Sequence, residues 1–483
     1  RRDAERGTPR RRGRSVLCCR QCMMARHPRS RSLSSTGHYA AGCITVTLLA
    51  ALSLILLRSP AAERRCDLSS YDPASTEALD LKRCKLSTLP VAIAEFRRLK
   101  KLDLGFNSLQ ALPALPPSLE VLFLLANRFE EVPRAISQLP RLRMLSFKSC
   151  ALRSVLVPLP VTLQWLILTD NRLAELPQQM GELVLMRKLM LSNNRLGALP
   201  RSMAAMRDLE LLRLANNRLR RLPEWLHAMP RLTWLAVAGN PCFAPAPARS
   251  SLQHVAYADL VLGDKVGEGT SGVVYKAAWK GQSVAVKLYK AELSSDGRSI
   301  DEVFASCAVE SKHVLRFLGY FTSPKLGAVL EWTSGLRALA KPPSLDSITR
   351  DTYPPAAAFG GLFIRRVARS IAAALAHLHS RGLAHGDMYA HNILVADSGE
   401  AKLSDFGAAF YYGREHAHAA TYERMEARAF GFLLQELIER HDGSDADQLG
   451  PVRALATACA APGNETPAPS TCASFERAQQ QLV

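Results

Sequence analysis

The chain has 483 residues, enough for two or three domains, and its 48% hydrophobic and 22% charged residues are typical of a globular protein. The formal net charge is +19, but residues 1–65 contain fourteen Arg and three acidic residues, which leaves +8 for the remaining 418 residues. Because the basicity belongs mainly to the N-terminal segment, and no arginine-rich face interleaved with aromatic residues follows it, no nucleic-acid partner is predicted.

The eleven cysteines are odd in number and scattered, and no cysteine pair caps the repeat region described below. This distribution favours a reducing compartment over a disulfide framework. Cys19 and Cys22 have CxxC spacing, but neither a second pair nor a neighbouring His accompanies them. We therefore predict a basic disordered segment over residues 1–38 and no zinc site there.

An uncharged run from Ala40 to Leu57 is eighteen residues long, just enough to cross a bilayer, and Arg58 follows it. We interpret residues 39–58 as an apolar membrane-anchor or targeting segment. A single-span anchor, the apolar part of a cleaved signal peptide and part of an organelle transit segment are the three alternatives. Membrane association is the expected localisation, with a cytoplasmic or organelle-targeted protein as the alternative, and the side of the membrane stays open.

From Leu79 onward the apolar pattern repeats every 20 to 23 residues. Each unit begins with an LxL-type triplet and carries Asn or Cys five residues after its first leucine, and eight units agree in both features. The first leucines are Leu79, Leu102, Leu122, Leu145, Leu166, Leu189, Leu212 and Leu235, and the residues five positions later are Cys84, Asn107, Asn127, Cys150, Asn171, Asn194, Asn217 and Asn240.

Two of these units, LSNNRLGALPRSMAAMRDLEL and LANNRLRRLPEWLHAMPRLTW, resemble the leucine-rich repeat family, of the intracellular type with LP after the Asn-containing turn. Each unit buries its leucines only against its neighbours, while Asn amides can bond backbone groups of adjacent turns. We therefore predict an α/β solenoid over residues 66–245 with a ladder of Asn side chains. Cys84 and Cys150 replace Asn in this ladder and are expected to be structural.

The resemblance implies that the concave strand face of the solenoid binds a protein. Side chains that flank the second Leu of each triplet are expected to point out of this face. An apolar patch with charged surroundings is suited to a protein interface. The apolar positions are Phe123, Leu125, Ile167 and Met190, and the polar positions are Asp80, Lys82, Asp103 and Arg213.

A Pro/Ala/Ser-rich stretch, PCFAPAPARSS, ends the repeats, and we interpret residues 246–256 as a linker. A further domain is predicted for residues 257–483. It begins with three strand-like segments, DLVLGDKV, GVVYKAAW and QSVAVKLY, and continues with a helix near Asp301–Val309. Helical signals dominate after Phe363, so a small β-rich lobe followed by a helical lobe is expected, a two-lobed α+β domain.

The β-rich lobe contains the glycine loop VGEGTSGVV followed by VAVK. Glycines in such a loop let backbone N–H groups approach phosphate closely, and Lys287 on the next strand can neutralise phosphate charge. This combination predicts a nucleotide-binding site. Its predicted residues are Val266, Gly267, Glu268, Gly269, Gly272, Val274, Ala285 and Lys287.

The helical lobe contributes HGDMYAHNILV and, thirteen residues after Asn392, the triplet DFG that begins at Asp405. The Asp387 carboxylate can accept the proton of an attacking hydroxyl. Oxygen atoms of Asn392 and Asp405 are suitable ligands for Mg²⁺. Asp387, Asn392 and Asp405 are therefore candidates for the chemistry of phosphoryl transfer.

From about Ala256 to its end the chain resembles the eukaryotic-type protein kinases, with a glycine loop of the tyrosine-kinase-like branch. The resemblance implies that ATP and Mg²⁺ are the cofactors, that Lys287 binds the α- and β-phosphates, and that Asp387 is the catalytic base. A Glu of the first lobe's helix should pair with Lys287; Glu302 is our choice and Glu310 the alternative.

The resemblance extends to two further places. Leu330, Glu331 and Trp332 in AVLEWTSG look like the hinge that holds adenine by its backbone, which adds Glu331 and Trp332 to the nucleotide-binding set. Glu426 stands where the family has a structural Asp that opens the helix after the activation segment.

The chain also departs from the family pattern. Gly386 replaces the Arg before the catalytic Asp, no A-P-E follows DFG, and Tyr389 stands where Ser/Thr kinases usually have Lys. An Arg before the base would grip a phosphate on the activation segment. Thr421 and Tyr422 are possible acceptors, but without that Arg we predict no control by activation-segment phosphorylation.

The sequence favours an ATP-dependent protein kinase, Ser/Thr more than Tyr, whose repeats recruit a protein partner. A catalytically inactive pseudokinase scaffold is the first alternative, although Lys287, Asp387 and Asp405 are all present. A small-molecule phosphotransferase is the second, because such enzymes also use H-G-D without A-P-E. The full glycine loop with VAVK argues against it.

Overall fold

The computed structural model describes residues 66–245 and 253–460, together with Phe475, Ala478, Gln480 and Leu482. The segments predicted for residues 1–38 and 39–58 therefore lie outside the described residues, as does most of the linker. No helix in the described ranges is long and apolar enough to cross a bilayer. Membrane association through the apolar run stays a prediction.

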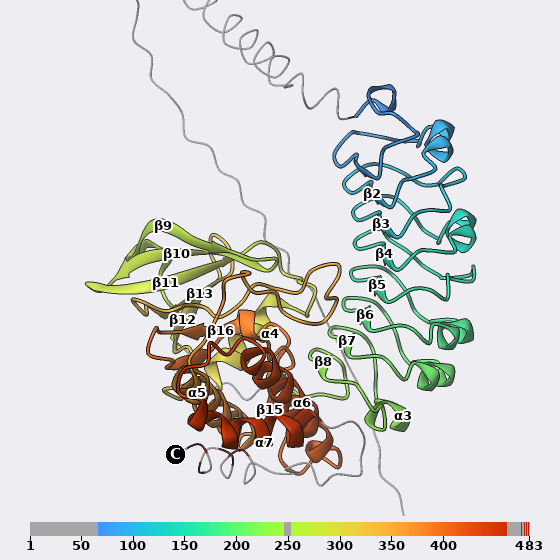
Figure 1. The fold of residues 1–483 in the computed structure, drawn as a ribbon. Helices are drawn as coiled ribbons and strands as arrows, with labels where there is room; N and C mark the ends of the chain where they lie inside the picture. Colours follow the sequence, from blue (N-terminus) through green and yellow to red (C-terminus); the bar gives the residue numbers. More distant parts are fainter. Residues whose placement is uncertain are drawn as a thin grey trace, which may run out of the picture. The chain divides into compact units, whose positions relative to one another are not determined.

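Residues 66–245, the repeat domain, form a solenoid whose eight short parallel strands build one sheet in sequence order (Figure 1). Each predicted first leucine is the central residue of a strand and lies opposite the next one in register, from Leu79 to Leu235. These leucines are at most 2% exposed. The strands are β1 (Ala78–Asp80), β2 (Lys101–Asp103), β3 (Val121–Phe123), β4 (Met144–Ser146), β5 (Trp165–Ile167), β6 (Lys188–Met190), β7 (Leu211–Arg213) and β8 (Trp234–Ala236).

Short helices lie on the side of the solenoid opposite the strands (Figure 1). Five of them begin directly after the proline of the LP motif, whose ring fixes φ close to the helical value. Such a repeat consists of a strand on one side of the solenoid and, on the other side, a helical turn that begins after a proline. This composition accounts for the period of 20 to 23 residues. The helices of the repeat domain are η1 (Leu68–Ser70), η2 (Val91–Glu95), η3 (Arg134–Gln138), η4 (Gln178–Glu182), η5 (Arg201–Ala205) and α3 (Glu224–His227).

The Asn ladder connects consecutive repeats. The amide nitrogen of Asn217 donates to the carbonyls of Leu191 and Leu214 at 3.0 and 2.9 Å, and its amide oxygen accepts from the Leu196 N–H at 3.0 Å. One side chain thus satisfies buried backbone groups of two repeats. The same pattern is made by Asn107, Asn127, Asn171, Asn194 and Asn240.

The two cysteines of the ladder differ from each other. Cys150 keeps a free, buried thiol at the expected position, 3.0 Å from the Leu124 carbonyl. Cys84 instead forms a disulfide with Cys66, so the prediction that no cysteine pair caps the repeats is wrong. In the described residues the sheet begins with β1 of the first repeat, and the disulfide ties the segment before this strand to the turn after it. Disulfides persist in oxidising compartments, so the argument for a reducing compartment loses its basis.

The first lobe of the following two-lobed domain is a five-stranded antiparallel sheet in the order β12-β13-β11-β10-β9. Two of its strands coincide with the predicted segments GVVYKAAW and QSVAVKLY. The helix α4 (Ser299–Cys307) packs beside this sheet, as predicted. The elements are η6 (Tyr257–Asp259), β9 (Leu260–Glu268), β10 (Gly272–Trp279), β11 (Gln282–Tyr289), β12 (Phe317–Phe321) and β13 (Gly327–Glu331).

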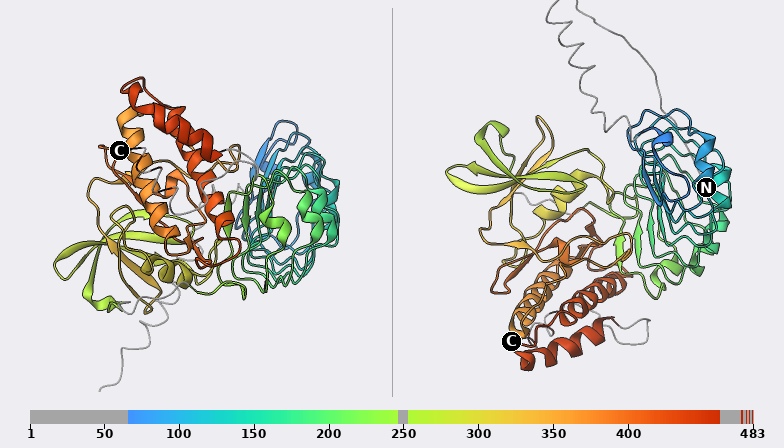
Figure 2. Two further views of the ribbon diagram at one scale, coloured as in Figure 1. Left: turned by 90° about the horizontal axis from the view of Figure 1, so that it is seen from below. Right: turned by 45° about the horizontal axis from the view of Figure 1, so that its top comes forward.

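The second lobe is mainly helical, with α5, α6 and α7 grouped away from the five-stranded sheet (Figure 2). Its core includes residues of all three helices and of the short strands that carry the predicted catalytic groups. The predicted fold class, a solenoid followed by a two-lobed α+β domain, is confirmed. The elements are β14 (Arg337–Ala338), α5 (Gly361–His379), β15 (Leu383–Ala384), η7 (Ala390–Asn392), β16 (Ile393–Val395), β17 (Ala401–Leu403), β18 (Phe410–Tyr411), α6 (Ala419–Ile438), η8 (Ala446–Gln448) and α7 (Leu449–Ala460).

The Asn ladder gives a first testable prediction. Asn217→Ala removes four hydrogen bonds at a residue that is 6% exposed, and should lower the free energy of unfolding by about 2 kcal/mol. Urea denaturation followed by circular dichroism measures this. Arg195→Ala, on the exposed surface of the adjacent repeat, is the control and should change stability by less than about 0.5 kcal/mol. Equal effects of the two substitutions would contradict the role of the ladder.

Candidate active site

A cavity of about 600 Å³ lies between the two lobes, within the size range of small-molecule sites. It is lined by every predicted nucleotide-binding residue except Glu268. The Glu268 carboxylate pairs with Lys265 and Lys290 outside the cavity, and hydrogen bonds from these two side chains lower its pKa to about 2. The predicted residues that line the cavity are Val266, Gly267, Gly269, Gly272, Val274, Ala285, Lys287, Glu331 and Trp332.

The glycine loop joins β9 to β10 at one wall of this cavity, closed by a hydrogen bond from Gly269 N–H to the Gly272 carbonyl at 2.9 Å. A Cβ at Gly272 would lie 2.8 Å from the Leu288 carbonyl oxygen, so this position requires glycine. At Gly267 and Gly269 nothing lies closer than 4.0 Å to such a Cβ. Those two glycines therefore leave open space on the cavity side, which allows backbone N–H groups to approach a ligand.

Lys287 on β11 and Glu302 on α4 form a buried ion pair, with 2.6 Å between Nζ and Oε1. The Lys287 Nζ also lies 3.4 Å from Asp405 Oδ1. Burial by itself would lower the pKa of Lys287, but the charges of Asp405 and Glu302 outweigh it, and the pKa is raised. Burial raises the pKa of Glu302 to about 7. The alternative partner, Glu310, is exposed and follows the end of α4.

The predicted catalytic loop, residues 385–392, places Asp387 and Asn392 side by side. Asn392 Nδ2 donates to the backbone carbonyl and to Oδ2 of Asp387, both at 2.9 Å. His385 Nδ1 accepts from the Asp387 N–H at 3.3 Å, and its Nε2 lies 3.0 Å from the Ser404 carbonyl, so Nε2 carries the proton. These bonds fix the loop relative to the DFG segment.

Asn392 and Asp405 fit a hard divalent cation by their chemistry. The amide nitrogen of Asn392 is engaged by Asp387, which leaves its amide oxygen as the group for a cation. Asp405 has φ +56°, a strained conformation for a residue other than glycine, and such strain is concentrated at functional sites. Its carboxylate is 43% exposed, beside the cavity. Carboxylate and amide oxygens are the ligands that Mg²⁺ prefers.

Glu426 on α6 lies beneath the catalytic loop and is 3% exposed. Its Oε1 accepts from the Gly386 N–H at 2.8 Å, and its Oε2 lies 2.8 Å from His379 Nε2 on α5. Glu426 therefore connects the Gly386 N–H to helices α5 and α6. It does not open its helix, as the resemblance implied, because α6 begins at Ala419.

The repeat domain contacts the catalytic loop, which the sequence did not indicate. Arg213 at the end of β7 is 2% exposed; its Nη2 hydrogen-bonds Asp387 Oδ1, and its Nη1 donates to the Gly386 carbonyl at 2.8 Å. Its Nε forms an ion pair with Asp296 Oδ1 at 2.7 Å. Burial by itself would raise the pKa of Asp387, but the charge of Arg213 outweighs it, and the pKa is lowered.

The contact with the repeat domain explains why residue 386 is a glycine. Its φ of +72° favours glycine, and a Cβ there would lie 2.5 Å from the Ala408 carbonyl oxygen and 2.6 Å from that of Leu235 in β8. A side chain at position 386 would therefore collide with the backbone of the last repeat. The Arg that the family pattern has at this position cannot be accommodated, and a cation reaches the base from the repeat domain instead.

Aromatic residues pack at the same contact between the repeat domain and the catalytic loop. Trp234 Nε1 donates to the Met388 carbonyl at 3.0 Å, and the indole stacks on Tyr389, with 4.3 Å between ring centroids. Tyr389 is 5% exposed, so it does not face solvent at the base. Further links between the domains are Lys148 with Ser295, Arg187 with Thr349, Lys188 with Ile348, Asn193 with Ser294, Glu210 with Thr349 and Arg350, and Leu232 with Arg428.

The concave strand face is therefore only partly open. Met190 is 9% exposed and belongs to the core of the second lobe, and Ile167 packs against that core. Arg213 is buried in the same contact. Phe123 and Leu125, nearer the start of the solenoid, are half-buried. The prediction of one continuous open surface from β1 to β7 needs this correction, because the two-lobed domain covers its C-terminal part.

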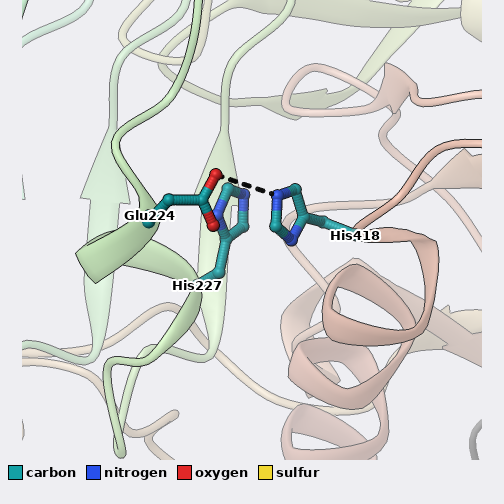
Figure 3. Close-up of side chains that lie close together, drawn as sticks. All are labelled: Glu224, His227 and His418. Atoms are coloured by element: carbon teal, nitrogen blue, oxygen red, sulfur yellow. Dashed lines mark ion pairs between the residues drawn. The ribbon is translucent and has the colours of Figure 1, made fainter.

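Three side chains of metal-ligand type meet at the rim of this contact (Figure 3). Ligand atoms of Glu224, His227 and His418 lie within 4.8 Å of one another. The rings of His227 and His418 are stacked, 3.5 Å apart with 6° between their planes, so their in-plane lone pairs do not converge on one ion. Burial, followed by the charge of His418, lowers the pKa of His227 to about 4. We interpret the group as a stacked pair of imidazole rings beside the Glu224 carboxylate.

The two possible phosphate acceptors of the activation segment lie in α6. Tyr422 is 1% exposed, and its hydroxyl is 3.2 Å from His227 Nε2, so it is inaccessible in this arrangement. Thr421 is half-buried. The premise that no Arg stands beside the base is wrong, since Arg213 does, but Arg213 is already paired with two carboxylates. The predicted absence of control by phosphorylation stays a prediction.

Sequence reasoning placed Arg213 on the open concave face and missed its role at Asp387, and it missed Trp234 and Asp296 altogether. No local pattern connects a solenoid strand to a loop more than 150 residues away. Their one signal was Gly386, an unexplained glycine beside the predicted base. Asp351 was also missed; it accepts from the backbone N–H of His391 at 2.9 Å and binds its Nδ1 at 2.7 Å.

Comparison with known proteins agrees with this arrangement. The family described as protein kinase domain matches residues 260–441, and the family described as leucine rich repeat matches residues 184–241. A probable LIM domain-containing serine/threonine-protein kinase of Dictyostelium discoideum is 30% identical over 214 residues, 40% of this chain and 32% of that protein.

A second protein of that description from Dictyostelium discoideum is 31% identical over 207 residues, 38% of this chain and 20% of the relative. LIM domain kinase 1 of Drosophila melanogaster is 30% identical over 155 residues, 31% of this chain and 12% of the relative. The matched parts thus span at most about a third of the length of these curated relatives.

The close approach at Gly386 gives a second prediction. Gly386→Ala should lower the free energy of unfolding by about 2 kcal/mol more than Gly281→Ala does. Both glycines have positive φ, +72° and +76°, so each substitution costs about 1 kcal/mol of backbone strain. Nothing lies within 4 Å of a Cβ at Gly281, so the difference measures the collision of a Cβ at position 386 with the carbonyl oxygens of Ala408 and of Leu235 in the last repeat. Urea denaturation measures both, and equal losses would mean that the domains do not touch there.

Proposed function

Since this chain has a leucine-rich repeat region followed by a protein kinase domain, we propose that it is an ATP-dependent protein kinase that phosphorylates Ser or Thr hydroxyls. The observation that carries the proposal is the joint placement of Lys287, Glu302 and Asp405 at one cavity, with Asp387 and Asn392 beside it. The names of two relatives, probable LIM domain-containing serine/threonine-protein kinases, support the choice of acceptor.

Each group has a role that its position allows. Lys287, held by Glu302, neutralises phosphate charge in the cavity. The acceptor hydroxyl gives its proton to Asp387 while its oxygen forms a bond to the γ-phosphorus. The bond from that phosphorus to the β-phosphate oxygen breaks, and ADP leaves. Asn392 and Asp405 would hold Mg²⁺, which supplies charge neutralisation at the phosphates when bound.

The two alternatives are less well supported. A pseudokinase scaffold is disfavoured because the Lys287–Glu302 pair is formed and the cavity is open for a nucleotide. A small-molecule phosphotransferase is disfavoured because the similarity covers a protein kinase domain from residue 260 to residue 441, glycine loop included. Assays with a generic protein and with a panel of small alcohols and amines distinguish these functions.

We also propose that the open part of the concave face, along β1 to β3, recruits a protein partner. Phe123 and Leu125 supply apolar surface there, and Asp80 and Lys82 supply charge. Membrane association through residues 40–57 is the proposed localisation, supported by the apolar run. The disulfide between Cys66 and Cys84 supports an oxidising environment for the repeats.

Phosphoryl transfer itself is tested at two residues. Lys287→Met and Asp405→Ala should each reduce ATP turnover by more than about 100-fold, because both groups act on phosphate charge. Glu302→Ala should reduce it less, since Glu302 acts through Lys287. Radiolabelled phosphate transfer to a generic protein measures the rates, and Glu310→Ala is the control that should retain them. Wild-type turnover in either of the first two variants would refute the assignment.

The partner site is tested by two substitutions away from the catalytic loop. Phe123→Glu combined with Leu125→Glu should remove proteins that co-purify with the chain, because two carboxylates replace apolar contact area on the open face. Quantitative mass spectrometry of affinity-purified protein measures this, and Arg195→Glu on the exposed surface is the control. If the double variant keeps every interactor, the β1 to β3 surface is not the binding site.

A further inference from the structure

Arg213 joins three parts of the molecule through one guanidinium group. It comes from β7 of the repeat domain, and its side chain is 3% exposed. Its Nη2 contacts Oδ1 of Asp387 and its Nη1 contacts the Gly386 carbonyl, both in the catalytic loop of the second lobe. Its Nε pairs with Asp296, which belongs to the first lobe and precedes α4. The repeat domain thus holds the two lobes at the predicted base.

The carboxylates around Arg213 explain why a positively charged side chain is needed at its position. Lys287 is engaged by Glu302 and Asp405. Asp387 and Asp296 both lie against the guanidinium of Arg213. Without Arg213, two partly buried carboxylates would face each other next to the phosphate site, and a buried charge left without its partner is strongly unfavourable. The Asp387 side chain would then turn away from its present orientation.

We propose that Arg213 is a positioning residue for the kinase reaction, acting through Asp387. The proposal rests on the proposed function. Arg213 donates a hydrogen bond to Oδ1 of the Asp387 carboxylate, and Asn392 donates one to Oδ2. These two contacts fix the plane of the carboxylate. A base must be oriented toward the hydroxyl proton within hydrogen-bond reach, and a displacement of about 1 Å can cost about 100-fold in rate. The leucine-rich repeats are therefore part of the catalytic centre.

Three observations favour positioning over inhibition by the repeats. The Lys287–Glu302 pair is formed while Arg213 is in place. The cavity of about 600 Å³ is open to a nucleotide in the same arrangement. The Asp387 side chain keeps 19% of its surface exposed, so a hydroxyl can still reach it. In addition, Gly386 leaves no room for a side chain beside Leu235, so the contact is built into the catalytic loop itself.

The test is steady-state kinetics on the full chain, with Mg²⁺, ATP and a generic protein substrate. Arg213→Met should lower kcat by about 100-fold and leave KM for ATP within about twofold, because Arg213 does not line the nucleotide cavity. Arg213→Lys, which restores the charge, should recover about tenfold of this loss. In the Asp387→Asn background, Arg213→Met should cause no further loss, since there is no base left to position.

The matched control is Arg187→Met, which removes another guanidinium that links the domains, through Thr349, without contacting Asp387. It should keep kcat within about twofold. A higher kcat in Arg213→Met would overturn the proposal and make the contact inhibitory, and an unchanged kcat would overturn it as well. So would an equal loss in Arg187→Met, which would indicate a general effect of the interface.

The proposed function and this inference fail in different ways. A wild-type chain without turnover would refute both, whereas an active wild-type chain with an active Arg213→Met variant would refute the positioning role alone. If Arg213→Met no longer binds ATP because it fails to fold, Arg213→Lys decides the question, since it keeps a buried cation opposite the carboxylates. A KM for ATP within about twofold of wild type, combined with a lowered kcat in Arg213→Lys, supports the proposal, and an unchanged kcat overturns it.

Discussion

The desolvated contact of Arg213 with Asp387 and Asp296 joins the repeat domain to both lobes of the domain that follows it. A buried ion pair contributes little net stability, because desolvation offsets the attraction, but losing one partner leaves a charge that the interior cannot accommodate. The pair therefore determines mainly how the domains are arranged and contributes little to stability. It fixes the seventh repeat against the catalytic loop, and through Asp296 it also reaches the first lobe. The relative position of the two lobes is thus connected to the position of the solenoid.

The packing of the repeats allows the solenoid to hold Arg213 at a fixed position. Parallel strands in register and the Asn ladder make each repeat depend on its neighbours, so β7 and β8 are held in place by the units before them. A rigid platform can present Arg213 and Trp234 at fixed positions to a loop in another domain. Short loops could not do so with the same accuracy.

The segment after the DFG triplet packs directly against the repeat domain. Small side chains of Ala215 and Ala236 in the last repeats pack against Ala408, directly after the DFG triplet. Trp234 stacks on Tyr389, and Glu426 supports the Gly386 N–H from below. Contacts of this kind order the loop around Asp387 through packing, and they give a physical reason for a loop without the Arg before the predicted base.

The sequence by itself determined the elements that depend on local pattern. The leucine period located all eight strands, the glycine loop with VAVK located the cavity, and the spacing of Asp387, Asn392 and Asp405 located the catalytic loop. The choice of Glu302 over Glu310 followed from its helix position. Such features are readable because each arises within one turn, strand or motif. The disulfide of Cys66, the burial of Met190 and the contacts of Arg213 depend on which surfaces meet after folding. Only the tertiary structure decided them, because exposed and interface positions of a repeat have the same local sequence pattern.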